Sequence, residues 1–321
     1  MKTISLGLRD WAWLTPLALG EIDLSPLSAF GLTLELSRVP TLPGSSDNPF
    51  DLAETSLSRH ATETAQGTTP RQGVPFFPMQ AFRHRCALVA RGSQAHSASD
   101  LEGTRVGLTG WHDSGNIWTR DALRHDGLST ETVQWFAGPL SAGGPAYDRV
   151  GPGRDRGDVH AINEGSTLVE KVEAGELDAL LTPFMPTQVY GPDATLRPLY
   201  AASAGPELAY YADRGYVPGI HLLTAAPELP MEIARAVVQV LVSSRSEWRS
   251  RRSRMQDEPV LAVDTAYQQQ LSGLNRGWDA PGLPSHRPMI ERFLGLQVEE
   301  GIISDAPSVD DLFAITTDWE D

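Results

Sequence analysis

Short apolar runs bounded by turn residues recur along the chain and predict strands. The first, residues 3–8, alternates apolar and polar positions and stops at Arg9 and Asp10. Later runs of four to eight residues, rich in branched and aromatic side chains, are typical of strands in a buried sheet. We predict these strands at residues 32–39, 50–54, 104–110, 132–136, 179–184, 194–200 and 218–225.

Helical patterns alternate with these strands. A short helix is predicted over residues 15–20, and another over residues 56–65 with its cap near Thr55 or Ser56. Further helices are expected from near Ser114, over residues 166–174, and over residues 231–251, 264–275 and 286–301. Residues 138–165 are rich in Gly and Pro and lack periodicity, which is typical of a lid or a disordered segment.

The order of elements predicts two lobes. Two extended segments, residues 82–91 and 218–225, bracket a middle region that has strands and helices of its own. Such alternation favours α/β layers with mainly parallel sheets. We predict that lobe one holds residues 1–88 and 222–321, and that lobe two holds residues 89–221. A ligand is expected in the cleft between the lobes, at carboxyl ends of strands and amino ends of helices.

Composition narrows the classes of function. The 321 residues include 26 Lys and Arg against 41 Asp and Glu, a net charge of −15. A chain this acidic has no general attraction for nucleic acid or an anionic membrane, so an anionic ligand requires a locally basic pocket. Cys86 is the single cysteine, which excludes an internal disulfide and cysteine-based zinc or iron–sulfur sites. No apolar run approaches the ~20 residues of a bilayer span, and Arg9 interrupts the N-terminal run early, so we expect a cytoplasmic protein.

Several motifs spread over residues 10–225 resemble one family of enzymes. They are LTPLALGEI, FDLAETSLSRH, FFPMQAFRHR, DLEGTRVGLTGW, EGSTLVEKVEAGELDALLTPFMP and AYYADRGYVPGIH. The spacings FP-x3-FRH and YY-x2-RG-x2-P-x2-H are the most specific of these. The chain is similar to the 4,5-dihydroxyphthalate decarboxylase family, within the type II periplasmic-binding-protein-like superfamily. That resemblance implies a two-lobed α/β fold whose lobes are joined by two hinge crossings.

The resemblance also implies a reaction. It is non-oxidative decarboxylation by a carboxy-lyase that acts on a hydroxylated aromatic carboxylic acid like 4,5-dihydroxyphthalate. The implied partner is a small aromatic or cyclic carboxylate, and no nucleic acid or membrane is expected as a partner. The resemblance leaves open whether the protein forms a homo-oligomer. The sequence requires no cofactor. Two alternatives share the fold: a non-catalytic binder of small carboxylates, serving a transporter or an intracellular sensor, and a lyase or dehydratase of another cyclic acid.

The run Phe82-Arg83-His84-Arg85 places three basic side chains in a segment predicted to be extended. Side chains alternate in a strand, so His84 is expected opposite Arg83 and Arg85. A guanidinium binds a carboxylate through two parallel hydrogen bonds. We therefore expect Arg83 or Arg85 to bind a substrate carboxylate and His84 to transfer a proton. The alternative is an edge strand with solvated arginines and a packed histidine.

The turn at residues 111–116, WHDSGN, lies between a predicted strand and a helix. Amide groups at a helix start bind anions, and Gly115 lets a ligand approach the backbone. Substrate contacts are expected from Asp113, Ser114, Gly115 and Asn116. His112 is a second candidate for proton transfer, with Asp113 orienting it. In the alternative, Asp113 or Ser114 only caps the helix and His112 is exposed.

Five further residues are expected at the ligand. Glu54 ends a predicted strand and is a candidate base toward a ring hydroxyl, and Ser56 is a candidate to bind an oxygen. His221 lies on the second crossing, and Thr182 and Met185 end a strand of lobe two. The alternatives are helix capping for Ser56 and core packing for the other three. The eight histidines show no HExxH pattern, so no metal site is predicted.

Overall fold

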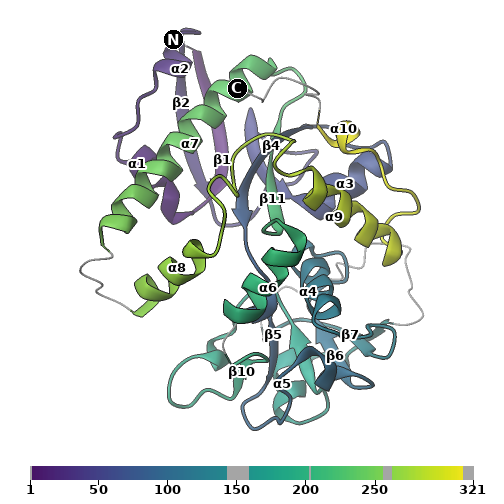
Figure 1. Cartoon of the computed structure of the whole chain (residues 1–321). Coiled ribbons are helices and arrows are strands. Elements are labelled where there is room, and N and C mark those ends of the chain that lie inside the picture. The colour runs from purple at the N-terminus through teal and green to yellow at the C-terminus, as the bar shows by residue number, and fades with distance from the viewer. Residues whose placement is uncertain (1, 143–158, 202–203, 256–261, 314–321) are drawn as a thin grey trace. The chain divides into compact units, whose positions relative to one another are not determined.

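The structure is a computed structural model of the whole chain, and it describes residues 2–142, 159–201, 204–255 and 262–313 (Figure 1). The chain divides into two compact units. Unit 1 holds Met1–Gln80, Gly219–Leu294 and Ile303–Asp321, and unit 2 holds Ala81–Pro218 and Gly295–Ile302. Most of the aperiodic segment 138–165, namely residues 143–158, lies outside the described residues.

Unit 1 is built on a mixed sheet. Within the described residues its strand order is β2-β1-β3-β11-β4. β1 (Lys2–Arg9) pairs in parallel with β2 (Leu32–Val39) and β3 (Leu52–Ser56), and β11 (Gly219–Ala225) runs antiparallel between β3 and β4 (Gln72–Gln80). Its helical segments are η1 (Ala12–Leu14), α1 (Thr15–Ala18), α2 (Ser25–Ser28), α3 (Leu57–Ala65), α7 (Met231–Arg254), α8 (Ala262–Ser272), α9 (Arg287–Glu299, whose end belongs to unit 2) and α10 (Val309–Leu312). The long helix α7 contacts η1, α1 and α2, and Leu6 of β1 and Val237 of α7 belong to one buried apolar core (Figure 1).

Unit 2 has its own sheet, in the order β10-β5-β9-β6-β7-β8 within the described residues. β6 (Arg105–Leu108) pairs in parallel with β7 (Gln134–Ala137) and β9 (Ala179–Leu181), and β8 (Val159–Ala161) extends this parallel part. β5 (Ala87–Ala90) and β10 (Leu196–Pro198) complete the sheet in antiparallel pairings. Its helical segments are η2 (His84–Cys86), η3 (Ala98–Leu101), α4 (Ser114–His125), α5 (Leu168–Glu173), η4 (Thr187–Val189) and α6 (Ala204–Arg214).

Residues 82–91 do not form the single extended strand that the sequence predicts. Strand β4 already ends at Gln80 in unit 1, and the 3₁₀ turn η2 precedes β5 in unit 2. Arg83, His84 and Arg85 therefore do not alternate across a sheet. The units divide at 80/81 and 218/219, whereas the predicted divisions are 88/89 and 221/222. Residues 295–302, predicted in lobe one, belong to unit 2.

In both sheets, parallel strands end together at one edge. In unit 1, β1 and β3 end beside the start of the antiparallel strand β11. In unit 2, β6 and β9 end beside the start of β5, because Leu181 pairs with Ala87. Loops and helix starts collect at such an edge, which is where α/β proteins bind ligands.

Candidate functional site

Arg83 is a buried cation at the strand-end edge of unit 2. It is 3% exposed, and its Nε and Nη2 atoms have no hydrogen-bond partner among the described residues. Its guanidinium lies against the first turn of α4, where a Cβ built on Gly115 would be 2.7 Å from Nη2. Burying a charge without compensation costs on the order of several kcal/mol. Because a helix start is also electropositive, this place is complementary to an anion.

Arg85 provides a direct contrast. Its Nε donates to Glu207 Oε1 at 3.2 Å, and its Nη2 donates to Oε1 at 3.0 Å and to Oε2 at 3.1 Å. Glu207 is 1% exposed, so Arg85 compensates a buried carboxylate of its own unit. In Arg85 the Nε and Nη2 atoms bind Glu207, whereas in Arg83 the same two atoms have no hydrogen-bond partner within residues 2–142, 159–201, 204–255 and 262–313.

The first turn of α4 is fixed by its own side chains. Asp113 is the N-cap residue, and its Oδ1 accepts a hydrogen bond from the Gly115 amide at 2.9 Å. Asn116 is fully buried, and its Nδ2 donates to Thr109 Oγ1 at 3.1 Å and to the Gly110 carbonyl at 3.0 Å. Asp113 and Asn116 thus hold the turn in place beside the Arg83 guanidinium.

The rest of this turn is anchored to the C-terminal piece of unit 2. Ser114, the first residue of α4, is buried, and His112 is partly buried. The Trp111 indole Nε1 donates to the Glu300 carbonyl at 3.1 Å, and the Arg120 guanidinium stacks 4.0 Å from the Trp111 ring centroid. Arg120 also forms an ion pair with the buried Glu300 carboxylate. The residue that precedes His112 is therefore fixed in place by the C-terminal piece of unit 2.

The turn after β9 touches the same helix start. Thr182 is buried, and its Oγ1 accepts a hydrogen bond from the Phe184 amide at 3.0 Å. The Pro183 Cβ lies 3.1 Å from a Cβ built on Gly115. Met185 packs against the apolar core of unit 2, whereas Phe184 is 44% exposed. The Thr182 turn thus borders the Arg83 site, while Met185 is directed toward the core.

His84 is packed among aromatic rings. It is 1% exposed, and the rings of Tyr200 and Tyr210 each lie 5.7 Å from its own. Neither ring nitrogen has a hydrogen-bond partner among the described residues. Burial lowers the pKa of His84 to about 4. The negative charge of Asp126 acts in the opposite direction, and His125 lowers the pKa further. His84 is therefore neutral at pH 7.

Unit 1 places a carboxylate and a histidine together at its own strand-end edge. Glu54 is fully buried, and its Oε2 accepts hydrogen bonds from the Arg9 amide at 2.9 Å and from Trp11 Nε1 at 2.8 Å. Its Oε1 accepts from His221 Nδ1 at 2.5 Å. Trp11 is not among the predicted site residues. The feature of the sequence that could have identified it is its position two residues after the end of β1.

Ser56 joins this edge to a helix. It ends β3 and is the N-cap of α3, with its Oγ accepting from the Arg59 amide at 3.5 Å. In the pairing of β3 with β11 it lies directly opposite His221. Glu54 is two residues earlier on the same face of β3, close enough for its side chain to reach His221 diagonally.

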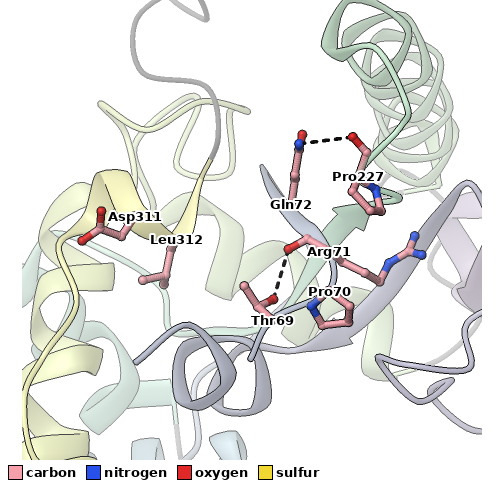
Figure 2. Close-up of a pocket in the computed structure, with 7 residues that line it drawn as sticks. All are labelled: Thr69, Pro70, Arg71, Gln72, Pro227, Asp311 and Leu312. Carbon is pink, nitrogen blue, oxygen red and sulfur yellow. Dashed lines mark hydrogen bonds between the residues drawn. The ribbon is translucent and has the colours of Figure 1, made fainter. Parts of the chain in front are cut away.

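A separate hollow of about 210 Å³ lies elsewhere in unit 1 (Figure 2). It is lined by Thr69, Pro70, Arg71, Gln72, Pro227, Asp311 and Leu312. Its polar groups bond to the protein itself: Thr69 Oγ1 donates to the Arg71 carbonyl at 3.1 Å, and Gln72 Nε2 donates to the Pro227 carbonyl at 3.4 Å. The predicted site residues are not among its lining, and we assign it no ligand.

Cys86 is a buried thiol. Burial raises its pKa, against the opposing charge of Arg83, so the thiol is not activated as a nucleophile. In the part of the chain that the structure describes, no group of three or more His, Cys, Asp or Glu side chains is placed to hold a metal ion. No helix there has the length and apolar character of a membrane span.

Two curated proteins are similar to this chain in sequence, although no family model matches it. A 4,5-dihydroxyphthalate decarboxylase from Pseudomonas putida is 29% identical over 185 residues, which cover 57% of this chain and 71% of that protein. A protein of the same name from Comamonas testosteroni is 27% identical over 267 residues, 79% of each chain. The resemblance seen in the motifs is confirmed, and the expectation of an enzyme with carboxy-lyase activity is borne out.

Solved structures bear on the fold. The periplasmic aliphatic sulphonate-binding protein SsuA from Escherichia coli matches with a TM-score of 0.57 at 16% identity, over 100% of this chain and 94% of that chain. At this identity the likeness shows the fold alone. The expected two-lobed α/β fold of the periplasmic-binding-protein type is confirmed.

Proposed function

We propose that the protein decarboxylates a hydroxylated aromatic carboxylic acid resembling 4,5-dihydroxyphthalate, without an oxidation step. The names of the two relatives support this reaction. The observation that carries the proposal is the buried Arg83 guanidinium beside the start of α4, whose Nε and Nη2 atoms have no hydrogen-bond partner in the part of the chain that the structure describes. A substrate carboxylate supplies the missing charge and accepts both N–H groups in the bidentate geometry that suits arginine.

The reaction replaces one ring carboxylate by a proton. A ring hydroxyl pushes electron density toward the carbon that carries the departing carboxylate. A side-chain acid protonates that carbon, the bond to the carboxyl carbon breaks, its electron pair restores the aromatic ring, and CO2 leaves. A positioned acid contributes about 10²–10⁴-fold to such a step. Orientation of the bound ring and exclusion of water supply much of the remainder.

Unit 2 supplies the carboxylate site in this proposal. Arg83 and Ser114 bind the anion, Gly115 leaves room for the guanidinium beside the helix start, and Thr182 lies next to them. Asp113 and Asn116 fix the turn, and His112 is the titratable side chain of that turn. We do not assign proton transfer to His84, because it is buried and neutral.

Calorimetry and product analysis with a panel of aromatic and cyclic acids test this proposal. We expect 4,5-dihydroxyphthalate to bind and to yield CO2 and a dihydroxybenzoate. Arg83→Gln should weaken binding at least ~10-fold, because it removes a charge-assisted bidentate contact. The matched control is Arg105→Gln, which removes a half-exposed ion pair with Asp178 in the same unit and should leave affinity unchanged. Tight binding without product would instead support the non-catalytic carboxylate binder.

A further inference from the structure

The Arg83 site of unit 2 suits a single carboxylate. Arg83 is 3% exposed, and its Nε and Nη2 atoms have no hydrogen-bond partner among the described residues. These two N–H groups lie on one edge of the guanidinium and match the two oxygens of one carboxylate. The start of α4, where a Cβ built on Gly115 would be 2.7 Å from Nη2, adds the positive end of a helix dipole. Both features favour a ligand group that keeps its negative charge.

The other cations of unit 2 already have partners in the protein. Arg120 and Arg124 form ion pairs with the buried Glu300, and Arg85 forms one with another buried glutamate. The remaining Lys and Arg side chains that the structure describes in this unit contact a carboxylate or a backbone carbonyl as well. Within that part of unit 2, Arg83 is therefore the cation that is left to pair with a ligand, and it pairs with one carboxylate.

A carboxylate bound to this guanidinium is a poor leaving group. Decarboxylation turns a charged carboxylate into neutral CO2, so the negative charge disappears from the place where it was bound. An ion pair with a buried guanidinium stabilises the starting carboxylate more than the transition state, which slows the step. Departure of this carboxylate would also leave Arg83 buried without compensation. Breaking a buried ion pair in this way is costly enough to slow the reaction by about 10²-fold or more.

We propose that Arg83 binds the carboxylate that stays on the ring, and that the second carboxylate of an aromatic diacid is the one released. This inference rests on the proposed function and specifies its substrate class, an aromatic acid with two carboxylates. In the step, the ring carbon gains a proton that a side-chain acid delivers and solvent replaces. The bond from this carbon to the departing carboxyl carbon breaks, and its electron pair restores the aromatic ring. A dianion and one proton become a monoanion and CO2, so charge balances, and the ion pair with Arg83 is the same before and after.

The proposal makes the product a ligand of the same site. Loss of one carboxylate from 4,5-dihydroxyphthalate leaves 3,4-dihydroxybenzoate, which keeps the carboxylate that Arg83 binds and has no second one to release. This monoacid should therefore be a competitive inhibitor and not a substrate. Its calorimetric affinity should fall at least ~10-fold in Arg83→Gln, because the charge-assisted contact is lost. The matched control, Arg105→Gln, removes a half-exposed ion pair of the same unit and should leave that affinity unchanged.

The half-amide of 4,5-dihydroxyphthalate decides which carboxylate Arg83 binds. One carboxylate of this compound is replaced by a neutral carboxamide of similar size, while the ring and both hydroxyls are kept. With its carboxylate on Arg83, the half-amide has only an amide in the place of the departing group. We expect the wild type to bind it within about tenfold of the diacid and to release no CO2 from it, while the diacid is turned over. Its affinity should also fall in Arg83→Gln.

Each outcome of these experiments has one meaning. If the wild type releases CO2 from the half-amide at a rate near that of the diacid, the inference is overturned and the proposed decarboxylase stands. This measurement requires no variant to fold. If the half-amide does not bind, the monoacid decides, and equal affinity for it in wild type and Arg83→Gln overturns the inference. If the wild type releases no CO2 from the diacid itself, the proposed function fails, and this inference fails with it.

Discussion

Three consecutive residues, Arg83, His84 and Arg85, meet three different surroundings in unit 2. Arg85 binds the buried Glu207, and His84 packs between two tyrosine rings. Arg83 is buried beside the start of α4 with two nitrogens that lack partners among the described residues. A cation held in this way destabilises the ligand-free protein, which is the signature of a residue kept for binding rather than for stability.

Arg83→Met tests that signature. Because methionine removes an uncompensated charge and keeps most of the volume, we expect the ligand-free variant to gain about 1 kcal/mol or more in free energy of unfolding. Arg120→Met is the control, since it removes one of the two arginines, Arg120 and Arg124, that form ion pairs with the buried Glu300, and it should destabilise the protein by about 1.5–3 kcal/mol. Denaturant unfolding measures both. Equal destabilisation by the two substitutions would show that Arg83 is structural.

His84 predicts a specific dependence of stability on pH. Its folded-state pKa of about 4 lies below the ordinary value of 6.5, because burial disfavours the imidazolium. Its contribution to stability is therefore complete above pH 6.5 and is lost as pH falls from there to about 4, by about 3 kcal/mol in total. His84→Phe should remove this part of the pH dependence in urea titrations at neutral pH and at about pH 4.5. Parallel curves for variant and wild type would contradict it.

At the scale of elements, the start of α4 depends on the absence of one side chain. Gly115 lies in the first turn, and a Cβ there would be 2.7 Å from Arg83 Nη2 and 3.1 Å from Pro183 Cβ. The close approach of backbone and guanidinium is what creates a site for an anion. The helix itself would tolerate alanine, which has the higher helix propensity.

Gly115→Ala should therefore fold and yet bind poorly. We expect the guanidinium to be displaced and the affinity for 4,5-dihydroxyphthalate to fall at least ~10-fold, about 1.4 kcal/mol. Gly205→Ala in α6 is the matched control, because a Cβ there meets open space and should leave binding unchanged. Calorimetry of both variants gives the comparison. If Gly115→Ala keeps the wild-type affinity, the start of α4 does not take part in binding the ligand.

The periodicity of apolar residues predicts where helices and strands lie along the chain better than it predicts which of them contact one another in the fold. It places β2 at residues 32–39 and the start of α4 at Ser114, and both are confirmed. It fails for residues 82–91, because alternation presumes one strand and the chain there leaves one unit and turns in the next. The pairing of β3 with β11 joins residues 167 apart, so the contact between Glu54 and His221 has no local signal. The burial of Arg83 with two nitrogens that have no hydrogen-bond partner among the described residues is likewise a tertiary property.

At the scale of the whole molecule, an acidic chain is proposed to bind an acidic ligand. A net charge of −15 repels anions at long range, so recognition must come from buried local charge at short range. The Arg83 site meets that requirement, because a guanidinium and a helix start converge there.

Ligand specificity should follow the carboxylate. At a concentration of about 100 times Kd, 4,5-dihydroxyphthalate should stabilise the protein by about 2.7 kcal/mol and raise Tm by several degrees. Catechol keeps the ring hydroxyls but has no carboxylate, so it should leave Tm unchanged. Differential scanning calorimetry measures both. A catechol shift as large as that of the acid would show that the ring, and not the anion, is recognised.

The most direct measurement is the product formed from 4,5-dihydroxyphthalate by the purified full chain, beside the same incubation with Arg83→Met. The account predicts one CO2 and one dihydroxybenzoate for each acid consumed by the wild type, and none above background from the folded variant. Acid recovered intact from the wild type, or equal turnover by Arg83→Met, would contradict it.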